Sequence, residues 1–131
     1  MADPVALYDG IVQALRADDD SVTTALFAPG FVTHEDPGVP YGGVIPGGQG
    51  FVDLRRKVIS YWQLKLLYRC GEPGGRHMSA FLSAKGHPGG PLDGIETFVN
   101  VSWTFDDNDK ALEARVFYFN TPPIAAALAH R

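Results

Sequence analysis

The sequence predicts a single α+β domain in which helices come first and an antiparallel sheet follows. Two observations indicate this fold class. Apolar residues recur every three or four positions through most of the first 62 residues, whereas from residue 64 onward they alternate with polar ones. The polar turn DDND joins the last two alternating segments as a hairpin. At 131 residues the chain is near the commonest size for one domain, so we expect residues 1–131 to form one unit.

Three helices are expected in the first half of the chain. The first begins at Asp3 and Pro4, and its apolar stripe consists of Tyr8, Ile11, Val12 and Leu15. The acidic run at residues 18–20 favours the start of a second, shorter helix, which Pro29 and Gly30 end. A third helix follows the GGQG segment, and its apolar face consists of Phe51, Leu54, Val58 and Trp62.

The strands predicted from alternation cover residues 31–36, 44–45, 64–70, 77–83, 95–105 and 112–119. In the first of them, FVTHED, alternation places Val32, His34 and Asp36 on one face. Thr33 and Glu35 then lie on the other face, and we expect the Val32 face to point inward. A short apolar helix at residues 124–128 ends the predicted elements. Helices followed by hairpin-connected strands favour an antiparallel sheet that is covered on one face.

Composition and charge exclude several classes of partner. The net charge of -4, without a broad basic stretch, argues against a nucleic-acid surface. No apolar run is long enough to cross a bilayer, and the start MADPVALYDG has no features of a secretory signal, so we expect a cytoplasmic protein. The single Cys70 cannot form an internal disulfide, and the four histidines lack metal-ligand spacing. We therefore expect no metal, no cofactor and no membrane, with a small apolar ligand as the partner.

Four segments are similar to those of a known family: ALFAPGFV after the two leading helices, HEDPGVPYGG, GGQGFVDLRRKV and RVFYFNTPPIAAAL. Over nearly its full length the chain resembles the NTF2-like superfamily, specifically its SnoaL-like and ketosteroid-isomerase-like branch. This resemblance implies a cone-shaped α+β barrel, in which a curved antiparallel sheet packs on three helices and encloses an apolar pocket. It also implies a homodimer that pairs through the outer face of the sheet. The branch includes isomerases, polyketide cyclases, epoxide-opening enzymes and proteins without catalysis.

The resemblance also implies catalytic residues. In ketosteroid isomerases the Asp of the EDP run is the general base that moves a proton beside a carbonyl, and this role falls on Asp36. Because histidine titrates near neutrality, His34 could donate to Asp36, share its proton or act as the acid. We therefore expect Asp36 and His34 to be catalytic residues that face the pocket. The alternative for Asp36 is a turn carboxylate that accepts backbone N–H groups before Pro-Gly.

Eight further residues are expected to contact the substrate. Tyr8 on the first helix, Tyr41 in the PYGG turn and Asn100 are candidate hydrogen-bond donors, with Val101 in place of Asn100 if that strand bulges. Arg115 is either an ion-pair partner of the proposed base or an electrophilic clamp. The expected aromatic lining consists of Trp62, Trp103, Phe117 and Phe119.

These features together predict a cofactor-independent enzyme of the SnoaL-like type. Its reaction would be proton transfer, isomerisation or ring closure on an apolar carbonyl compound, such as a polyketide or a steroid. Two alternatives stay open. One is a non-catalytic module for ligand binding or assembly that keeps the pocket. The other is an epoxide hydrolase or epoxide-opening cyclase that uses Asp36 and Arg115.

Overall fold

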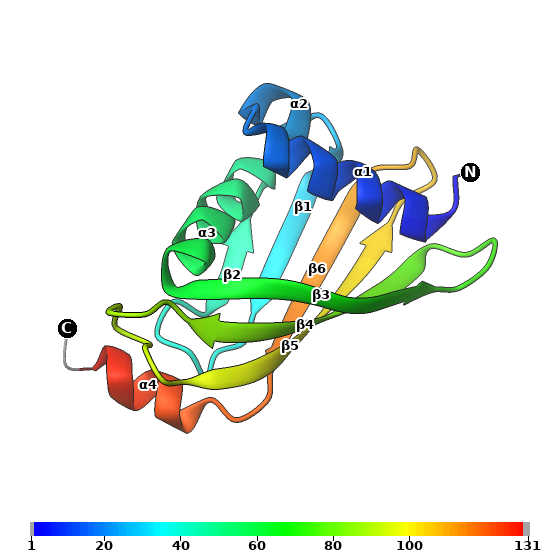
Figure 1. The fold of residues 1–131 in the computed structure, drawn as a ribbon. Coiled ribbons are helices and arrows are strands. Elements are labelled where there is room, and N and C mark those ends of the chain that lie inside the picture. Colours follow the sequence, from blue (N-terminus) through cyan, green and yellow to red (C-terminus); the bar gives the residue numbers. More distant parts are fainter. Residues whose placement is uncertain (1, 130–131) are drawn as a thin grey trace.

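The computed structural model describes residues 2–129 as a curved six-stranded sheet with helices packed against one face (Figure 1). The helices are α1 (Pro4–Ala17), α2 (Asp20–Thr24), α3 (Gly48–Tyr61) and α4 (Pro122–Leu128). The strands are β1 (Phe27–Glu35), β2 (Gly43–Pro46), β3 (Trp62–Gly71), β4 (His77–Gly86), β5 (Glu96–Phe105) and β6 (Ala111–Tyr118). This order of elements confirms the α+β class expected from the sequence.

The strands lie in the order β2-β1-β6-β5-β4-β3. Strands β3 to β6 form an antiparallel meander, in which each strand pairs with the next along the chain. Strand β1 instead pairs in parallel with β6, the last strand of the chain. The sheet is therefore antiparallel except at this one pair, which joins the start of the fold to its end.

The helices form for local reasons that the sequence shows. The helix α1 begins at Pro4, directly after Asp3, and its buried face packs Tyr8, Ile11 and Leu15 against the sheet. The Asp19 carboxylate accepts the backbone N–H groups of residues 21 and 22 and so caps α2. The longest helices, α1 and α3, have 14 residues each. Among residues 2–129, no helix is both long and apolar enough to cross a membrane.

Strand β1 differs from its prediction in length and in orientation. It begins at Phe27, so Pro29 and Gly30 do not end a helix but lie exposed within the strand, where its register against β6 shifts. An exposed irregularity of this kind tolerates proline, which has no N–H group to donate. The buried residues of the following segment are Phe31, Thr33 and Glu35, whereas Val32 and His34 are half-buried. The expectation that the Val32 face points inward is therefore wrong.

Candidate functional site

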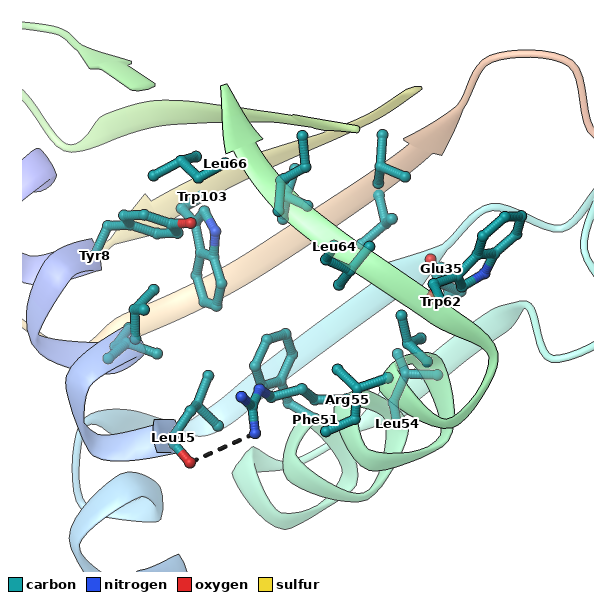
Figure 2. Close-up of a pocket in the computed structure, with 18 of the residues that line it drawn as sticks. Tyr8, Leu15, Glu35, Phe51, Leu54, Arg55, Trp62, Leu64, Leu66 and Trp103 are labelled. Carbon is teal, nitrogen blue, oxygen red and sulfur yellow. Dashed lines mark hydrogen bonds between the residues drawn. The ribbon is translucent and has the colours of Figure 1, made fainter. Parts of the chain in front are cut away.

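A cavity of about 460 Å³ lies between the inner face of the sheet and helices α1 and α3 (Figure 2). This volume is within the range of sites that bind drug-sized molecules. Most of the wall is aliphatic, and it includes Ile11, Val12, Leu54, Val58, Leu82 and Val99. The exposed lining residues Arg16, Ile59 and Leu64 lie on α1, α3 and β3, so the cavity meets solvent between these elements.

The Glu35 carboxyl is the one acidic group among the described lining residues of the cavity. It comes from the last position of β1, and only 3% of the residue is exposed. Its Oε1 atom is buried without a hydrogen-bond partner in the described part of the chain. Burial raises the pKa of Glu35 to about 7; the backbone N–H of Asp36 opposes this shift, and the charge of Asp36 adds to it slightly. A carboxyl with this pKa both takes up and releases protons near neutral pH.

A chain of hydrogen bonds lies beside Glu35 at the same end of the cavity. Trp62 Nε1 donates to Tyr41 Oη over 2.9 Å, and Tyr41 Oη donates to Tyr118 Oη over 2.9 Å. Trp62 and Tyr118 line the cavity, while Tyr41 lies buried behind them. Burial raises the pKa of Tyr41 to about 12, and burial followed by the charge of Glu35 raises the pKa of Tyr118. Both phenols are therefore neutral near pH 7. The hydroxyl of Tyr118, a lining residue, thus remains protonated and able to donate a hydrogen bond.

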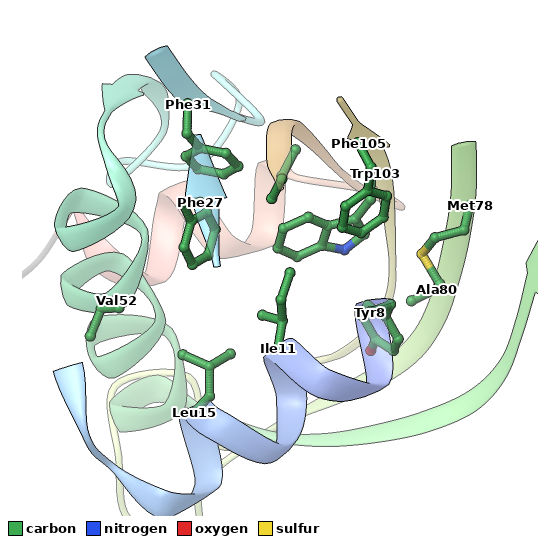
Figure 3. Packing of buried hydrophobic residues seen from close by; sticks show 12 residues of the cluster. Tyr8, Ile11, Leu15, Phe27, Phe31, Val52, Met78, Ala80, Trp103 and Phe105 are labelled. Carbon is green, nitrogen blue, oxygen red and sulfur yellow. The ribbon is translucent and has the colours of Figure 1, made fainter. Parts of the chain in front are cut away.

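The opposite end of the cavity is formed by Tyr8 and Trp103, whose ring centres are 6.1 Å apart. Both belong to a buried cluster with Phe27 and Phe31 from β1 (Figure 3). Burial is the main cause of a raised pKa at Tyr8. The Trp103 Nε1 atom is buried and has no acceptor within residues 2–129. This end is therefore aromatic, with a neutral phenol hydroxyl that donates or accepts and an indole N–H that only donates.

Three of the ten predicted site residues line the cavity: Tyr8, Trp62 and Trp103. Tyr41 was expected at the pocket mouth, but it is 8% exposed and lies outside the lining, where its hydroxyl bonds to Trp62 and Tyr118 and its ring packs edge-on against Tyr118. Val101, the alternative to Asn100, also lines the cavity. Of the predicted aromatic lining, the two tryptophans are thus in place.

Asp36 and His34 do not face the cavity, which corrects the prediction made for both. Asp36 lies beyond the end of β1; its Oδ1 accepts the Gly38 N–H over 2.9 Å, and its Oδ2 accepts the Tyr118 N–H over 3.0 Å. This is the turn role named above as the alternative, and it also ties the turn to β6. His34 lies on the outer sheet face, where its Nε2 is 3.8 Å from Glu113 Oε2.

The other four predicted residues, Asn100, Arg115, Phe117 and Phe119, lie outside the cavity, which is a second correction. Asn100 stands opposite Phe117 in the β5–β6 register, and Phe117 and Phe119 are 55% and 72% exposed. Arg115 donates from Nε to Glu113 Oε1 over 2.5 Å and so pairs with its own strand. In β6 the buried positions are the alternate ones, 114, 116 and 118, because side chains of a strand point to opposite faces in turn.

No family model matches this chain, and no curated protein sequence matches it. Its fold, however, is shared by solved structures. An NTF2-like protein from Burkholderia thailandensis superposes with a TM-score of 0.76 at 19% identity, over 100% of this chain and 99% of that one. This chain has an NTF2-like fold. The fold predicted from the four sequence segments is thus confirmed.

Two further structures relate the NTF2-like domain to proteins with named activities. A steroid delta-isomerase from Pseudomonas aeruginosa has a TM-score of 0.74 at 16% identity, over 100% of this chain and 92% of that one. The epoxide hydrolase/cyclase-like enzyme SalBIII, which has a role in pyran ring formation in the polyether salinomycin, has a TM-score of 0.65 at 14% identity. That alignment covers 90% of this chain and 92% of SalBIII. At these identities the likeness shows the fold, and the chemistry rests on the side chains.

The polar residues of this NTF2-like site were missed because the inward faces of β1 and β6 were chosen wrongly. The predicted pocket face of β1 excludes Glu35, and the predicted pocket face of β6 holds Phe117 and Phe119 in place of Tyr118. One signal favours Glu35: Phe31, the largest apolar residue of its strand, shares a face with Glu35 rather than with Asp36. No group of three or more His, Cys, Asp or Glu residues within residues 2–129 is placed to hold a metal ion.

Proposed function

We propose that this protein binds a small apolar carbonyl compound in its cavity and catalyses cofactor-independent proton transfer on it, with Glu35 as the acid–base group. The observation that carries this proposal is the Glu35 carboxyl, buried in an apolar cavity of ligand size with its Oε1 atom lacking a hydrogen-bond partner in the described part of the chain. A buried carboxyl oxygen without a partner costs folding free energy, so its presence in a ligand-sized cavity favours a functional role.

The expected chemistry follows from the groups around the cavity. Ionised Glu35 removes a proton from the carbon beside the carbonyl, and negative charge then develops on the carbonyl oxygen. The Tyr118 hydroxyl donates to that oxygen, and its own oxygen already accepts a hydrogen bond from Tyr41. Protonated Glu35 returns the proton to the same or another carbon, which gives exchange or isomerisation. Asp36 stays outside this scheme because both of its oxygens accept backbone N–H groups.

Proton exchange from a ketone is the direct test. A panel of apolar ketones, including a β,γ-unsaturated steroid ketone, is incubated with the protein in D₂O, and loss of the α-protons is followed by NMR. We expect exchange above the buffer rate, and Glu35→Gln should lower it by about 10²-fold or more. Asp36→Asn is the matched control, since it changes the neighbouring carboxyl and should keep most of the rate. Full activity of Glu35→Gln would refute the assignment.

A ligand-binding module without catalysis is the alternative from another class. It keeps the same cavity, and the proton-exchange experiment separates the two. Tight binding of ketones without exchange on any of them would favour the binding module. The epoxide-opening alternative, which relied on Asp36 and Arg115, loses its support because neither residue lines the cavity.

We also propose that the protein forms a homodimer through the outer sheet face. Tyr68, Phe81 and Phe98 stack in a row across β3, β4 and β5, with ring centres 5.0 and 5.3 Å apart. Phe117 and Phe119 continue this aromatic face toward β6. An exposed apolar patch of this kind is typical of a protein–protein contact. The cytoplasmic location stays a prediction.

A further inference from the structure

The guanidinium of Arg55 lines the cavity from α3 and has little pairing there. It donates from Nη1 to the carbonyl oxygen of Leu15 over 3.4 Å, a long hydrogen bond that crosses from α3 to α1 (Figure 2). Within residues 2–129 no carboxylate forms an ion pair with it. Desolvation is the main effect on this half-buried cation, and it lowers the pKa of Arg55.

Acidic residues lie near Arg55, but they form ion pairs with the neighbouring Arg56. Its guanidinium pairs with Asp18 at 2.9 Å, Asp20 at 2.5 Å and Asp53 at 3.7 Å on the surface between α2 and α3. Arg55 points instead into the cavity, where a half-buried charge costs free energy unless an anion compensates it. Two adjacent arginines on one helix therefore have opposite environments, one neutralised and one not.

The position of Arg55 suits the anchoring of one end of a ligand. Figure 2 shows its guanidinium beside Leu15 and Phe51, whereas Glu35 lies next to Trp62 farther along the cavity. Arg16, another lining residue, adds positive charge at the mouth. A molecule that fills the cavity would therefore meet the Arg55 cation on the side where α3 faces α1 and the carboxyl of Glu35 at one end, with apolar wall between these two groups.

We propose that the ligand of this cavity is an amphipathic carboxylic acid, whose carboxylate pairs with Arg55 while its apolar body extends toward Glu35. The planar guanidinium offers two parallel N–H groups that match a carboxylate, and one cation balances one monoanion. The inference names the substrate class of the proposed function, and it rests on ligand binding there but not on proton transfer.

The test compares acids with neutral molecules of the same shape. The probes are 2-naphthylacetate against 2-naphthylacetamide, and decanoate against decanamide, titrated at pH 6 by calorimetry. The decanoate pair is also followed by fluorescence, because the chain has only two tryptophans and both Trp62 and Trp103 line the cavity. We expect each acid to bind wild-type protein about tenfold more tightly than its amide, the lower range for a charge-assisted hydrogen bond.

Variants assign the preference to a residue. Arg55→Met keeps an unbranched apolar stem and should remove the preference for acids while leaving amide binding unchanged. Arg55→Lys keeps the charge and should retain part of the preference, which also guards against a folding defect in the methionine variant. Arg56→Met is the matched control and should keep the full preference.

The outcomes separate this inference from the proposed function. Equal affinity of acids and amides for wild-type protein, or a preference that survives in folded Arg55→Met, would overturn the role of Arg55 and leave the proposed function standing. Absence of binding for all four probes at millimolar concentration would overturn the proposed ligand class, whereas the ketone exchange experiment tests the proposed function separately. Loss of the preference in Arg55→Met, with proton exchange unaffected by the acid probes, would support the anchor and count against Glu35 acting on the same ligand.

Discussion

The buried carboxyl of Glu35 predicts a specific dependence of stability on pH. Its pKa in the folded protein is about 7, against 4.5 for the free side chain. A difference of this size corresponds to about 3 kcal/mol of folding free energy. Because the folded pKa is the higher one, the unfolded chain releases the proton first as pH rises. The contribution of Glu35 is therefore fully favourable below about pH 4.5 and is lost as pH rises through about 7.

The measurement compares wild-type protein with Glu35→Gln, which cannot ionise. Urea unfolding at half-unit steps from pH 5 to pH 8, followed by tryptophan fluorescence, gives the free energy of unfolding of both proteins. From pH 5 to pH 8, the free energy of unfolding of the variant should rise relative to that of wild type by more than about 2 kcal/mol. Subtracting the two curves removes the titration of histidines and other groups that both proteins share.

Glu96→Gln serves as the control, because it removes a surface carboxylate, 69% exposed, that pairs only with Lys85 at 3.6 Å. Its pH curve should run parallel to that of wild type. A free-energy difference between Glu35→Gln and wild type that does not change from pH 5 to pH 8 would refute the reasoning. It would mean that Glu35 reaches water or finds a partner, and the proposed acid–base role would lose its physical basis.

Three further variants test separate parts of the site. Asp36→Ala leaves the N–H groups of Gly38 and Tyr118 without acceptors, so the free energy of unfolding should fall by about 2 kcal/mol. Unchanged stability in a urea titration would contradict the turn role. Tyr118→Phe removes the proposed donor, and its proton-exchange rate should fall by about tenfold or more with the fold retained; a wild-type rate would argue that the oxygen is stabilised elsewhere. Phe117→Asp places a charge on the aromatic outer face and should give a monomer in sedimentation experiments, whereas a persisting dimer would place the interface on another surface.

The fold could be predicted from the sequence because its signals are spread over many residues. The apolar stripe of α1, the change of period after α3 and the hairpin turn before β6 each persist over several residues, so one misread position does not alter them. The parallel pairing of β1 with β6 could not be predicted in the same way. It joins segments at opposite ends of the chain, and no local pattern specifies such a partner.

The site was harder to predict because it depends on which alternate residues of two strands, β1 and β6, face the cavity. A shift of one residue exchanges the two faces of a strand completely. In β1 the adjacent Phe31 and Val32 are both apolar, so either face could be the buried one. In β6 the adjacent Phe117 and Tyr118 are both aromatic, so the sequence does not show which of them points inward; in the structure Phe117 is exposed and Tyr118 is buried. The tryptophans Trp62 and Trp103 were found because large aromatic residues lie inside under most arrangements.

The hydrogen bond from the Tyr118 N–H to Asp36 joins residues that are 82 positions apart. During synthesis, the turn after β1 leaves the ribosome long before the strand that holds it. The first strand, with Glu35 at its end, has only the short β2 as a partner until β6 has emerged. Contacts of such long range slow folding, since a large loop must close before they form. We therefore expect the acidic end of the cavity to be assembled late in folding, after the β3–β5 meander has paired.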